Sequence, residues 1–142
     1  MAIIKKRTSL EGSKWAEEAF VLFDTGSTYS CIKLEIAKKM GIVEKLPRPI
    51  VLGTAKEGEG VTASEAIRLY FYINSYRFSD EFIMIPMLSE PVIIGAATMQ
   101  KERFKLDLEN EEVIIDPRVT KLRLLYLSFS LKNGSNLSFK NG

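Results

Sequence analysis

Apolar residues along the chain fall into short runs, some alternating with polar residues and some continuous, which is the pattern of β-strands. The expected strands cover residues 2–8, 15–23, 29–32, 50–55, 61–73, 77–85 and 92–94, with turns at 11–13 and 74–76. Another hairpin is expected around residues 109–111, because Phe104, Leu106 and Leu108 alternate with charges before an apolar run at 113–115. We therefore predict an all-β fold class.

Helical spacing is confined to two short segments. The apolar residues between positions 34 and 40 lie on one face of a helix, and Gly41 follows where a helix C-terminal glycine belongs. Prolines at positions 47 and 49 exclude helix immediately afterwards. A second brief helix is expected from Gly95 through Lys101, with Ala96 and Met99 more suited to the core than to ligand binding.

One strand leads directly into a polar turn. The continuous apolar run at residues 20–23 indicates burial on both faces, and it ends at Asp24. A carboxylate in that position is costly unless hydrogen bonds or a second charge stabilise it. Gly26 allows the backbone to approach the carboxylate closely, and the hydroxyls of Thr25 and Ser27 can donate to it.

The stretch Asp24-Thr25-Gly26-Ser27 behind an apolar strand resembles the active-site loop of aspartic proteases, and its continuation resembles their single-lobe, retroviral-type (retropepsin-like) branch. About 71 residues further on, an apolar run ends with Ile93, Ile94 and Gly95 before a short helix, which resembles the second signature of that family. The resemblance covers residues 15–117. The alternative interpretation is an ordinary Asp-Thr-Gly turn between two strands.

The resemblance implies a closed β-barrel with one or two short helices and a flap hairpin, formed by a protease domain at residues 1–117. Residues 118–131 then form a C-terminal strand extension, in which apolar residues alternate between positions 122 and 131, and residues 132–142 form a polar tail. We expect the extension, together with residues 2–5, to contribute to a dimer interface. The alternative is that residues 119–131 pack on their own domain.

The flap is expected between the strands at 50–55 and 61–73. Its residues are Lys56, Glu57, Gly58, Glu59 and Gly60. A phosphate loop beginning at Gly53 is excluded, because glutamate and glycine replace the lysine and hydroxyl residue that such a loop requires. The charged tip differs from the apolar tips of retroviral enzymes, and a plain surface hairpin is the alternative.

Aspartic protease chemistry requires two facing carboxylates that share one proton around a water molecule. This chain has one suitable loop, since Asp80, Asp107 and Asp116 are followed by glutamate, leucine and proline. The second Asp24 is therefore expected from a second copy of the chain, in an endopeptidase active as a homodimer. The resemblance implies that Thr25 reaches across to the partner's loop.

The sequence is compatible with two alternative functions. The first is a catalytically weak or inactive module that keeps the protease fold for dimerisation or peptide binding. The second is an unrelated β-rich ligand-binding domain. Neutral residues occupy positions 28, 29, 96 and 97, where retroviral enzymes often carry charges, so apolar side chains are expected to be preferred at the cleavage site. An acidic to mildly acidic pH optimum is expected, because one proton must stay on the carboxylate pair.

The amino-acid composition excludes several other kinds of catalytic site. The 142 residues suit one domain and contain no histidine, which excludes Ser-His and Cys-His nucleophile pairs and histidine-ligated zinc. Cys31 is the single cysteine and is expected in the core. The acidic segment 107–112 lacks the pattern of a calcium loop, so we expect no metal or cofactor.

Charge and targeting signals bear on partners and location. A net charge of +2 argues against nucleic-acid or anionic-membrane partners, and the expected partners are a second subunit and a protein or peptide substrate. No apolar run reaches the ~18 residues of a membrane span. Because no apolar signal sequence is recognisable and no disulfide can form within the chain, a cytoplasmic location is expected.

Overall fold

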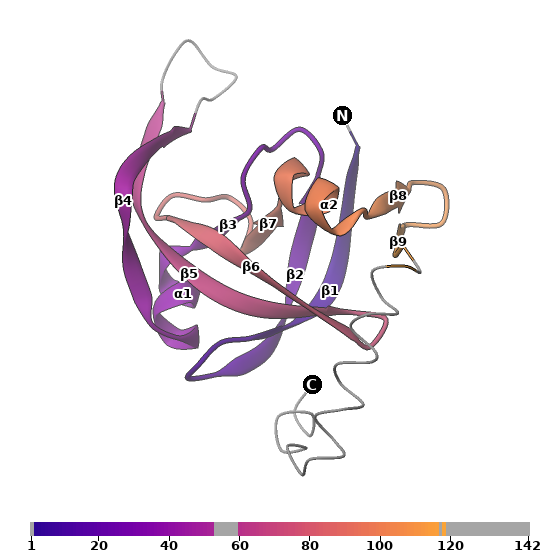
Figure 1. The fold of residues 1–142 in the computed structure, drawn as a ribbon, viewed down its shortest axis with the longest axis horizontal. Helices are drawn as coiled ribbons and strands as arrows, with labels where there is room; N and C mark the ends of the chain where they lie inside the picture. Colours follow the sequence, from indigo (N-terminus) through magenta and orange to yellow (C-terminus); the bar gives the residue numbers. More distant parts are fainter. Residues whose placement is uncertain (1, 53–59, 117, 119–142) are drawn as a thin grey trace.

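The structure is a computed structural model that describes residues 2–52, 60–116 and 118. Figure 1 shows a rolled sheet with a short helix at each side. Its elements are β1 (Ile3–Glu11), β2 (Ala16–Asp24), β3 (Cys31–Lys33), α1 (Leu34–Met40), β4 (Val43–Leu52), β5 (Val61–Ile73), β6 (Tyr76–Ile85), β7 (Val92–Ile94), α2 (Ala96–Glu102), β8 (Lys105–Asp107) and β9 (Glu112–Ile114).

Six strands form a closed barrel in the order β1-β2-β7-β3-β6-β5, and pairing between β1 and β5 completes the circle. Strand β4 extends the sheet beyond β5, and β8 and β9 form a separate hairpin. A closed barrel leaves few unpaired strand edges to attract other chains. The prediction of an all-β retropepsin-like barrel with short helices is confirmed.

Aromatic rings fill the centre of the barrel. Phe71, Phe78 and Phe82 are fully buried, and the rings of Phe71 and Phe78 stack with centroids 5.6 Å apart. Phe104 packs edge-on against Phe78 at 4.9 Å, which anchors the segment after α2 in the same core. Replacing one of these buried rings by alanine costs about 3–5 kcal/mol of stability in proteins generally.

The strand that carries Asp24 is buried on one face only. Val21 and Phe23 point into the core, whereas Phe20 is 49% exposed and Leu22 is half-buried. The prediction of burial on both faces is therefore wrong. The antiparallel ribbon of β1 and β2 turns one face outward, and there the guanidinium of Arg7 lies over the Phe20 ring, 5.2 Å from its centroid.

Several element boundaries differ from the predicted ones. Strand β1 continues to Glu11, because it pairs with β2 along nine residues, and β4 begins at Val43 rather than at residue 50. The pairing of β4 with β5 is interrupted between Lys45 and Ile50. Pro47 and Pro49 lie in that interruption, where no backbone donor is needed.

Helix α1 and the turn at Asn74 and Ser75 agree with the prediction, and these two turn residues have φ angles of 52° and 70°. Gly41 caps α1 in an extended conformation, with φ of −179°, rather than in the left-handed one. A Cβ at Gly41 would lie 2.9 Å from Ser13 Oγ. Close packing against the 11–13 turn therefore accounts for this glycine.

Most of the predicted flap tip, Lys56 to Glu59, lies outside the described residues, as do the extension after Arg118 and the polar tail. Gly60 is described and lies exposed just before β5. Within residues 2–52, 60–116 and 118, no helix has the length and apolar character needed to cross a membrane.

Candidate active site

The topology brings the two signature segments together. Asp24 is the last residue of β2, and β7 lies between β2 and β3, the strands that enter and leave the Asp24 loop. In the parallel pairing of β2 with β7, Phe23 lies opposite Ile94. Ile93 lies opposite Cys31 in the antiparallel pairing of β7 with β3. Segments about 70 residues apart in sequence therefore meet at one end of the barrel.

Backbone amides hold the Asp24 loop. The amide of Gly26 donates to Asp24 Oδ1 at 2.8 Å, and the amide of Ser27 donates to the Asp24 carbonyl at 3.1 Å. The expected close approach of Gly26 to the carboxylate is present. As a residue, Asp24 is half-buried, so it is partly accessible to solvent.

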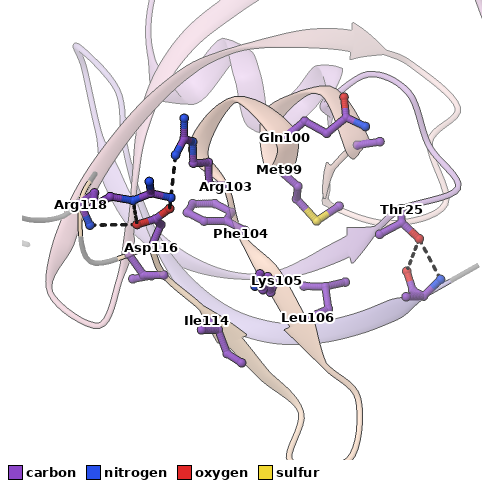
Figure 2. Close-up of a pocket in the computed structure, with 13 residues that line it drawn as sticks. Thr25, Met99, Gln100, Arg103, Phe104, Lys105, Leu106, Ile114, Asp116 and Arg118 are labelled. Atoms are coloured by element: carbon purple, nitrogen blue, oxygen red, sulfur yellow. Dashed lines mark hydrogen bonds and ion pairs between the residues drawn. The ribbon is translucent and has the colours of Figure 1, made fainter.

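The predicted hydroxyl donors to the Asp24 carboxylate are wrong. Thr25 Oγ1 accepts a hydrogen bond from the Ala2 amide at 2.8 Å and donates to the Ala2 carbonyl at 3.3 Å (Figure 2). Ser27 Oγ donates to the Tyr29 carbonyl at 2.9 Å. Short hydroxyl side chains bond readily to nearby backbone, and here both hydroxyls have backbone carbonyl acceptors.

The glycine of the second signature is required by close backbone approach. A Cβ at Gly95 would lie 2.5 Å from the Tyr29 carbonyl oxygen and 2.7 Å from that of Ser27. Immediately after Gly95, the amide of Ala96 donates to the Ser27 carbonyl at 2.6 Å, and the amide of Ala97 donates to the Thr28 carbonyl at 3.1 Å. The start of α2 is thus bonded to the middle of the Asp24 loop.

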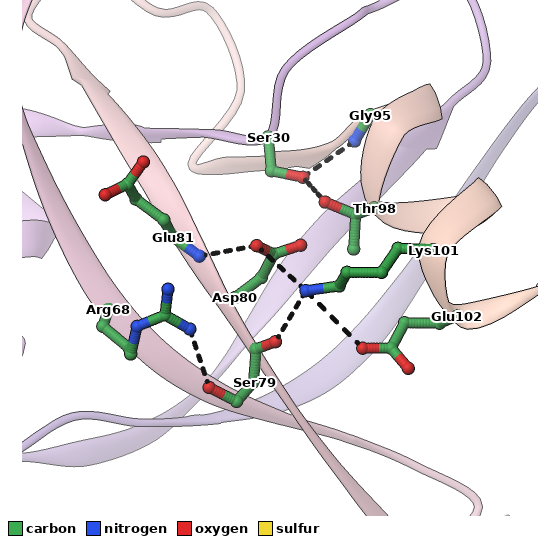
Figure 3. Close-up of polar contacts among 9 residues, drawn as sticks. All are labelled: Ser30, Arg68, Ser79, Asp80, Glu81, Gly95, Thr98, Lys101 and Glu102. Carbon is green, nitrogen blue, oxygen red and sulfur yellow. Dashed lines mark hydrogen bonds and ion pairs between the residues drawn. The ribbon is translucent and has the colours of Figure 1, made fainter. Parts of the chain in front are cut away.

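Sequence reasoning missed two polar residues that join the same segments. The Gly95 amide donates to Ser30 Oγ at 3.0 Å, and Ser30 Oγ lies 2.6 Å from Thr98 Oγ1 (Figure 3). Both side chains are only 4% exposed. In the sequence each of these residues is a hydroxyl residue next to an apolar run. That pattern does not indicate which group the hydroxyl will bond to.

A neutral groove borders the Asp24 loop. We call it the groove; it has a volume of about 560 Å³ and is lined by residues 26–29, 31, 51, 52, 61, 85, 87–89 and 93. The loop forms one wall, and the base of the β4–β5 hairpin contributes Val51, Leu52 and Val61. None of these described lining residues carries a charge. The groove is therefore suited to an uncharged, partly apolar ligand.

A larger cavity lies on the other side of the loop, along α2. We call it the α2 cavity; its volume is about 910 Å³, and it is lined by residues 2, 25, 96, 99, 100, 103–106, 114–116 and 118 (Figure 2). Asp116 receives hydrogen bonds from Arg118, at 2.9 Å from the amide and at 3.0 Å from the guanidinium, and lies 3.7 Å from Arg103. These contacts, led by the Arg118 guanidinium, lower the pKa of Asp116 to about 2.

Cys31 is a core residue, as predicted. It is 4% exposed, and Sγ donates weakly to the Tyr29 carbonyl at 3.6 Å. Burial raises the pKa of the thiol to about 11, which disfavours the reactive thiolate. In the described part of the chain, no group of three or more potential metal ligands lies close enough together to hold an ion.

A barrel that presents an Asp-Thr-Gly loop, backed by a glycine at the start of a short helix, defines a single-lobe aspartic protease domain. The sequence matches the family model for retroviral aspartyl protease over residues 10–121. The chain therefore belongs to the retroviral aspartyl protease family.

One solved structure agrees with this fold, and a second gives a weaker superposition. The retroviral protease-like domain of Ddi1 from Leishmania major superposes with a TM-score of 0.61 at 16% identity, covering 82% of this chain and 90% of that one. The EIAV protease complexed with the inhibitor HBY-793 gives a TM-score of 0.47 at 18% identity, covering 73% and 91%. A comparison with curated proteins found no match.

Proposed function

We propose that this protein is an aspartic endopeptidase that acts as a homodimer, with Asp24 of each subunit forming one shared active site. The observation that carries the proposal is the Asp24 loop itself. In this loop the Gly26 amide donates to the carboxylate of the half-buried Asp24 at 2.8 Å, and two loop carbonyls accept from the amides that follow Gly95. The chain has one such loop, so a partner must supply the second carboxylate.

The chemistry follows from placing two carboxylates close together. Because like charges at that distance cannot both ionise, the pair holds one proton. The ionised Asp24 takes a proton from a water molecule, which attacks the scissile carbonyl carbon. The protonated Asp24 gives its proton to the carbonyl oxygen, which produces a gem-diol intermediate. The Asp24 that took the water proton then passes it to the leaving nitrogen as the C–N bond breaks, and one hydroxyl of the intermediate returns its proton to the other Asp24, so the acid and amine products leave and the pair again holds one proton. Thr25 and Gly26 keep the loop in place, and Ser27 has a supporting role.

The second subunit is proposed to bind on the side where Thr25 lies. Thr25 opens onto the α2 cavity, and the lining of that cavity includes Met99, Leu106 and Ile114. Ile114 is 48% exposed in the single subunit. In the dimer Thr25 contacts the partner's loop, which requires its hydroxyl to share or release its two bonds to Ala2.

The substrate is proposed to lie in the groove. Its described lining is uncharged, and Val51 is 69% exposed beside it, so apolar side chains are accepted and charged ones are disfavoured. The hairpin that joins β4 and β5, including residues 56–60, is proposed to close over the bound peptide as a flap. Cytoplasmic location stays a prediction.

The direct test is cleavage of an unfolded protein or peptide library from about pH 3 to about pH 7, with and without pepstatin. Asp24→Asn should lower cleavage at least about 10³-fold, since the variant homodimer lacks both carboxylates of the pair. Asp107→Asn is the matched control, because Asp107 lies in β8 and accepts hydrogen bonds from Asn110 rather than from the Asp24 loop. Pepstatin-insensitive cleavage, or equal cleavage by Asp24→Asn, would contradict the proposal.

One observation favours a second candidate, a peptide-binding or dimerisation module with little turnover. The Thr25 hydroxyl is already satisfied within a single subunit by Ala2, so the loop is complete without a partner. A dimer confirmed by sedimentation that cleaves no substrate across the pH range, yet binds peptides, would support this module. Cleavage lost in Asp24→Asn would exclude it.

A further inference from the structure

We propose that Ser30 and Thr98 are positioning residues, and that their buried hydroxyl pair holds the Asp24 loop at the alignment catalysis requires. This inference rests on the proposed function and deepens it. Neither residue reaches the reacting atoms. They act through the loop backbone. Their hydrogen bonds fix the position of Ser30, the last residue of the loop that begins at Asp24.

The hydroxyl pair joins the end of the loop to α2. Ser30 Oγ accepts from the Gly95 amide at 3.0 Å and lies 2.6 Å from Thr98 Oγ1 (Figure 3). Both residues are 4% exposed, so water does not compete for these groups. A buried amide that loses its acceptor is left unsatisfied, and the local backbone must move to find another partner.

Ser30 is bonded in two directions. Its carbonyl accepts from the Ile83 amide on β6 at 2.9 Å, while its side chain bonds to the start of α2. The loop is therefore fixed at its beginning by the Gly26 amide, in its middle by the amides at the start of α2, and at its end by Ser30. Among the bonds between the loop and α2 in the described residues, those of Ser30 and Thr98 are the ones made by side chains.

Helix α2 has an independent attachment to β6. Lys101 Nζ lies 3.3 Å from both the Ser79 carbonyl oxygen and Asp80 Oδ1 (Figure 3). This contact, together with the burial of Met99, holds the helix on the barrel. Loss of the hydroxyl pair therefore moves the loop relative to α2 and leaves the helix in place.

A small shift of the loop has a large catalytic effect in this design. The two Asp24 carboxylates must face each other across the dimer, and a 1 Å misplacement can cost about 10²-fold in rate. Ser30 and Thr98 do not line the groove, but residues 26–29 of the loop form one of its walls, so we expect KM to change as well, by less than kcat. The separation of the carboxylates also sets how strongly they share a proton, so the apparent pKa values in the pH profile of kcat move with the loop.

The test compares Ser30→Ala and Thr98→Val, which remove a hydroxyl, with Thr98→Ser, which retains one. Ser30→Ala should lower kcat about 100-fold and Thr98→Val about tenfold, with a smaller change in KM and a displaced acidic limb of the pH profile. Thr98→Ser should stay close to wild type. Thr8→Val is the matched control, because Thr8 is also 4% exposed but bonds within β1, to the Lys6 carbonyl at 3.2 Å.

A second measurement does not depend on activity. Hydrogen exchange at the Gly95 amide should be at least about tenfold faster in Ser30→Ala than in wild type and unchanged in Thr8→Val. Unchanged exchange, or a loss of kcat no greater than that of Thr8→Val, would overturn the inference. If the wild-type protein cleaves nothing, the proposed function fails, and the Gly95 exchange still decides whether Ser30 holds the loop.

Discussion

Two surfaces meet at the Asp24 loop, and adjacent residues of the loop face them separately. Gly26 to Tyr29 line the groove, whereas Thr25 lines the α2 cavity. The groove has no charged residue among its described lining, while the α2 cavity combines apolar side chains with a charged rim that includes Arg103, Asp116 and Arg118.

The difference indicates a division of roles. An uncharged groove accepts varied apolar peptide side chains, whereas an apolar centre with a charged rim resembles the anatomy of protein–protein interfaces. In this account the groove binds substrate and the α2 cavity binds the second subunit. Substitutions placed in one surface should therefore leave the role of the other intact.

The largest loss of stability and activity is expected at Gly95, because its close contact with the Asp24 loop supports the loop residues that line both surfaces. Gly95→Ala places a Cβ within 2.7 Å of two carbonyl oxygens of the Asp24 loop, which must then move. Overpacking of this kind costs about 1–3 kcal/mol, and we expect a lower unfolding midpoint in denaturant together with loss of cleavage.

Gly60→Ala is the control for this substitution. The Cβ it adds meets the Cγ1 of Val51 at 3.0 Å, a side-chain atom of an exposed residue that can turn away. Its stability should stay close to wild type. Equal stability of the Gly95→Ala protein, measured in the same denaturation experiment, would show that the two signatures do not need their close approach.

The next largest effect concerns the α2 cavity. Ile114→Lys puts a charge on the proposed subunit surface and should weaken the dimer at least about tenfold, so that cleavage is lost on dilution. Sedimentation across a concentration series measures the change. Leu108→Lys is the control, since Leu108 is 54% exposed on the same hairpin but does not line the cavity. If both variants weaken the dimer equally, the α2 cavity is not the specific surface.

A change in the groove should alter substrate binding alone. Val51→Glu should raise KM for apolar peptides about tenfold, because apolar discrimination in pockets is typically worth 10–200-fold, and it should leave the dimer unchanged. Ile42→Glu alters a similarly exposed aliphatic residue outside the groove and should have no effect on KM. If the activity of Val51→Glu were lost on dilution, the groove would also contribute to dimerisation, and the proposed separation of roles between the two surfaces would be wrong.

The smallest effect comes from Asp116 at the rim. Its pKa lies at about 2, below the ordinary value of 3.8, so its ionised form stabilises the folded state above about pH 4 and this stabilisation is lost as pH falls through 2. The unfolding midpoint of wild type should exceed that of Asp116→Asn at neutral pH, and the gap should close near pH 2. If the difference between the two unfolding midpoints grew as the pH fell, the stabilisation could not come from the ionised Asp116 carboxylate.

The sequence predicted the elements that local patterns specify. Apolar spacing predicts α1 and β7 with their observed bounds, and the resemblance points to Asp24 and Gly95, whose segments the fold brings together. The structure supplies the reason for the glycine, which is the 2.5 Å approach of a Cβ to a loop carbonyl.

Contacts between distant segments could not be predicted in the same way. Ser30 and Thr98 are 68 residues apart, and a lone hydroxyl beside an apolar run does not indicate which segment will bond to it. The sequence predicts that the hydroxyls of Thr25 and Ser27 donate to the nearby carboxylate, but in the fold they donate to the backbone carbonyls of Ala2 and Tyr29. The outward position of Phe20 depends on the β1–β2 ribbon and its Arg7 contact.

The central claim is that one active site takes Asp24 from each of two chains, and mixing subunits tests it most directly. Wild-type and Asp24→Asn subunits are combined in equal amounts, allowed to exchange, and assayed at fixed total protein. If both carboxylates are required, only wild-type pairs are active, and cleavage falls to about a quarter of the all-wild-type value. A fall to only about half, in proportion to the wild-type fraction, would mean that each chain works alone.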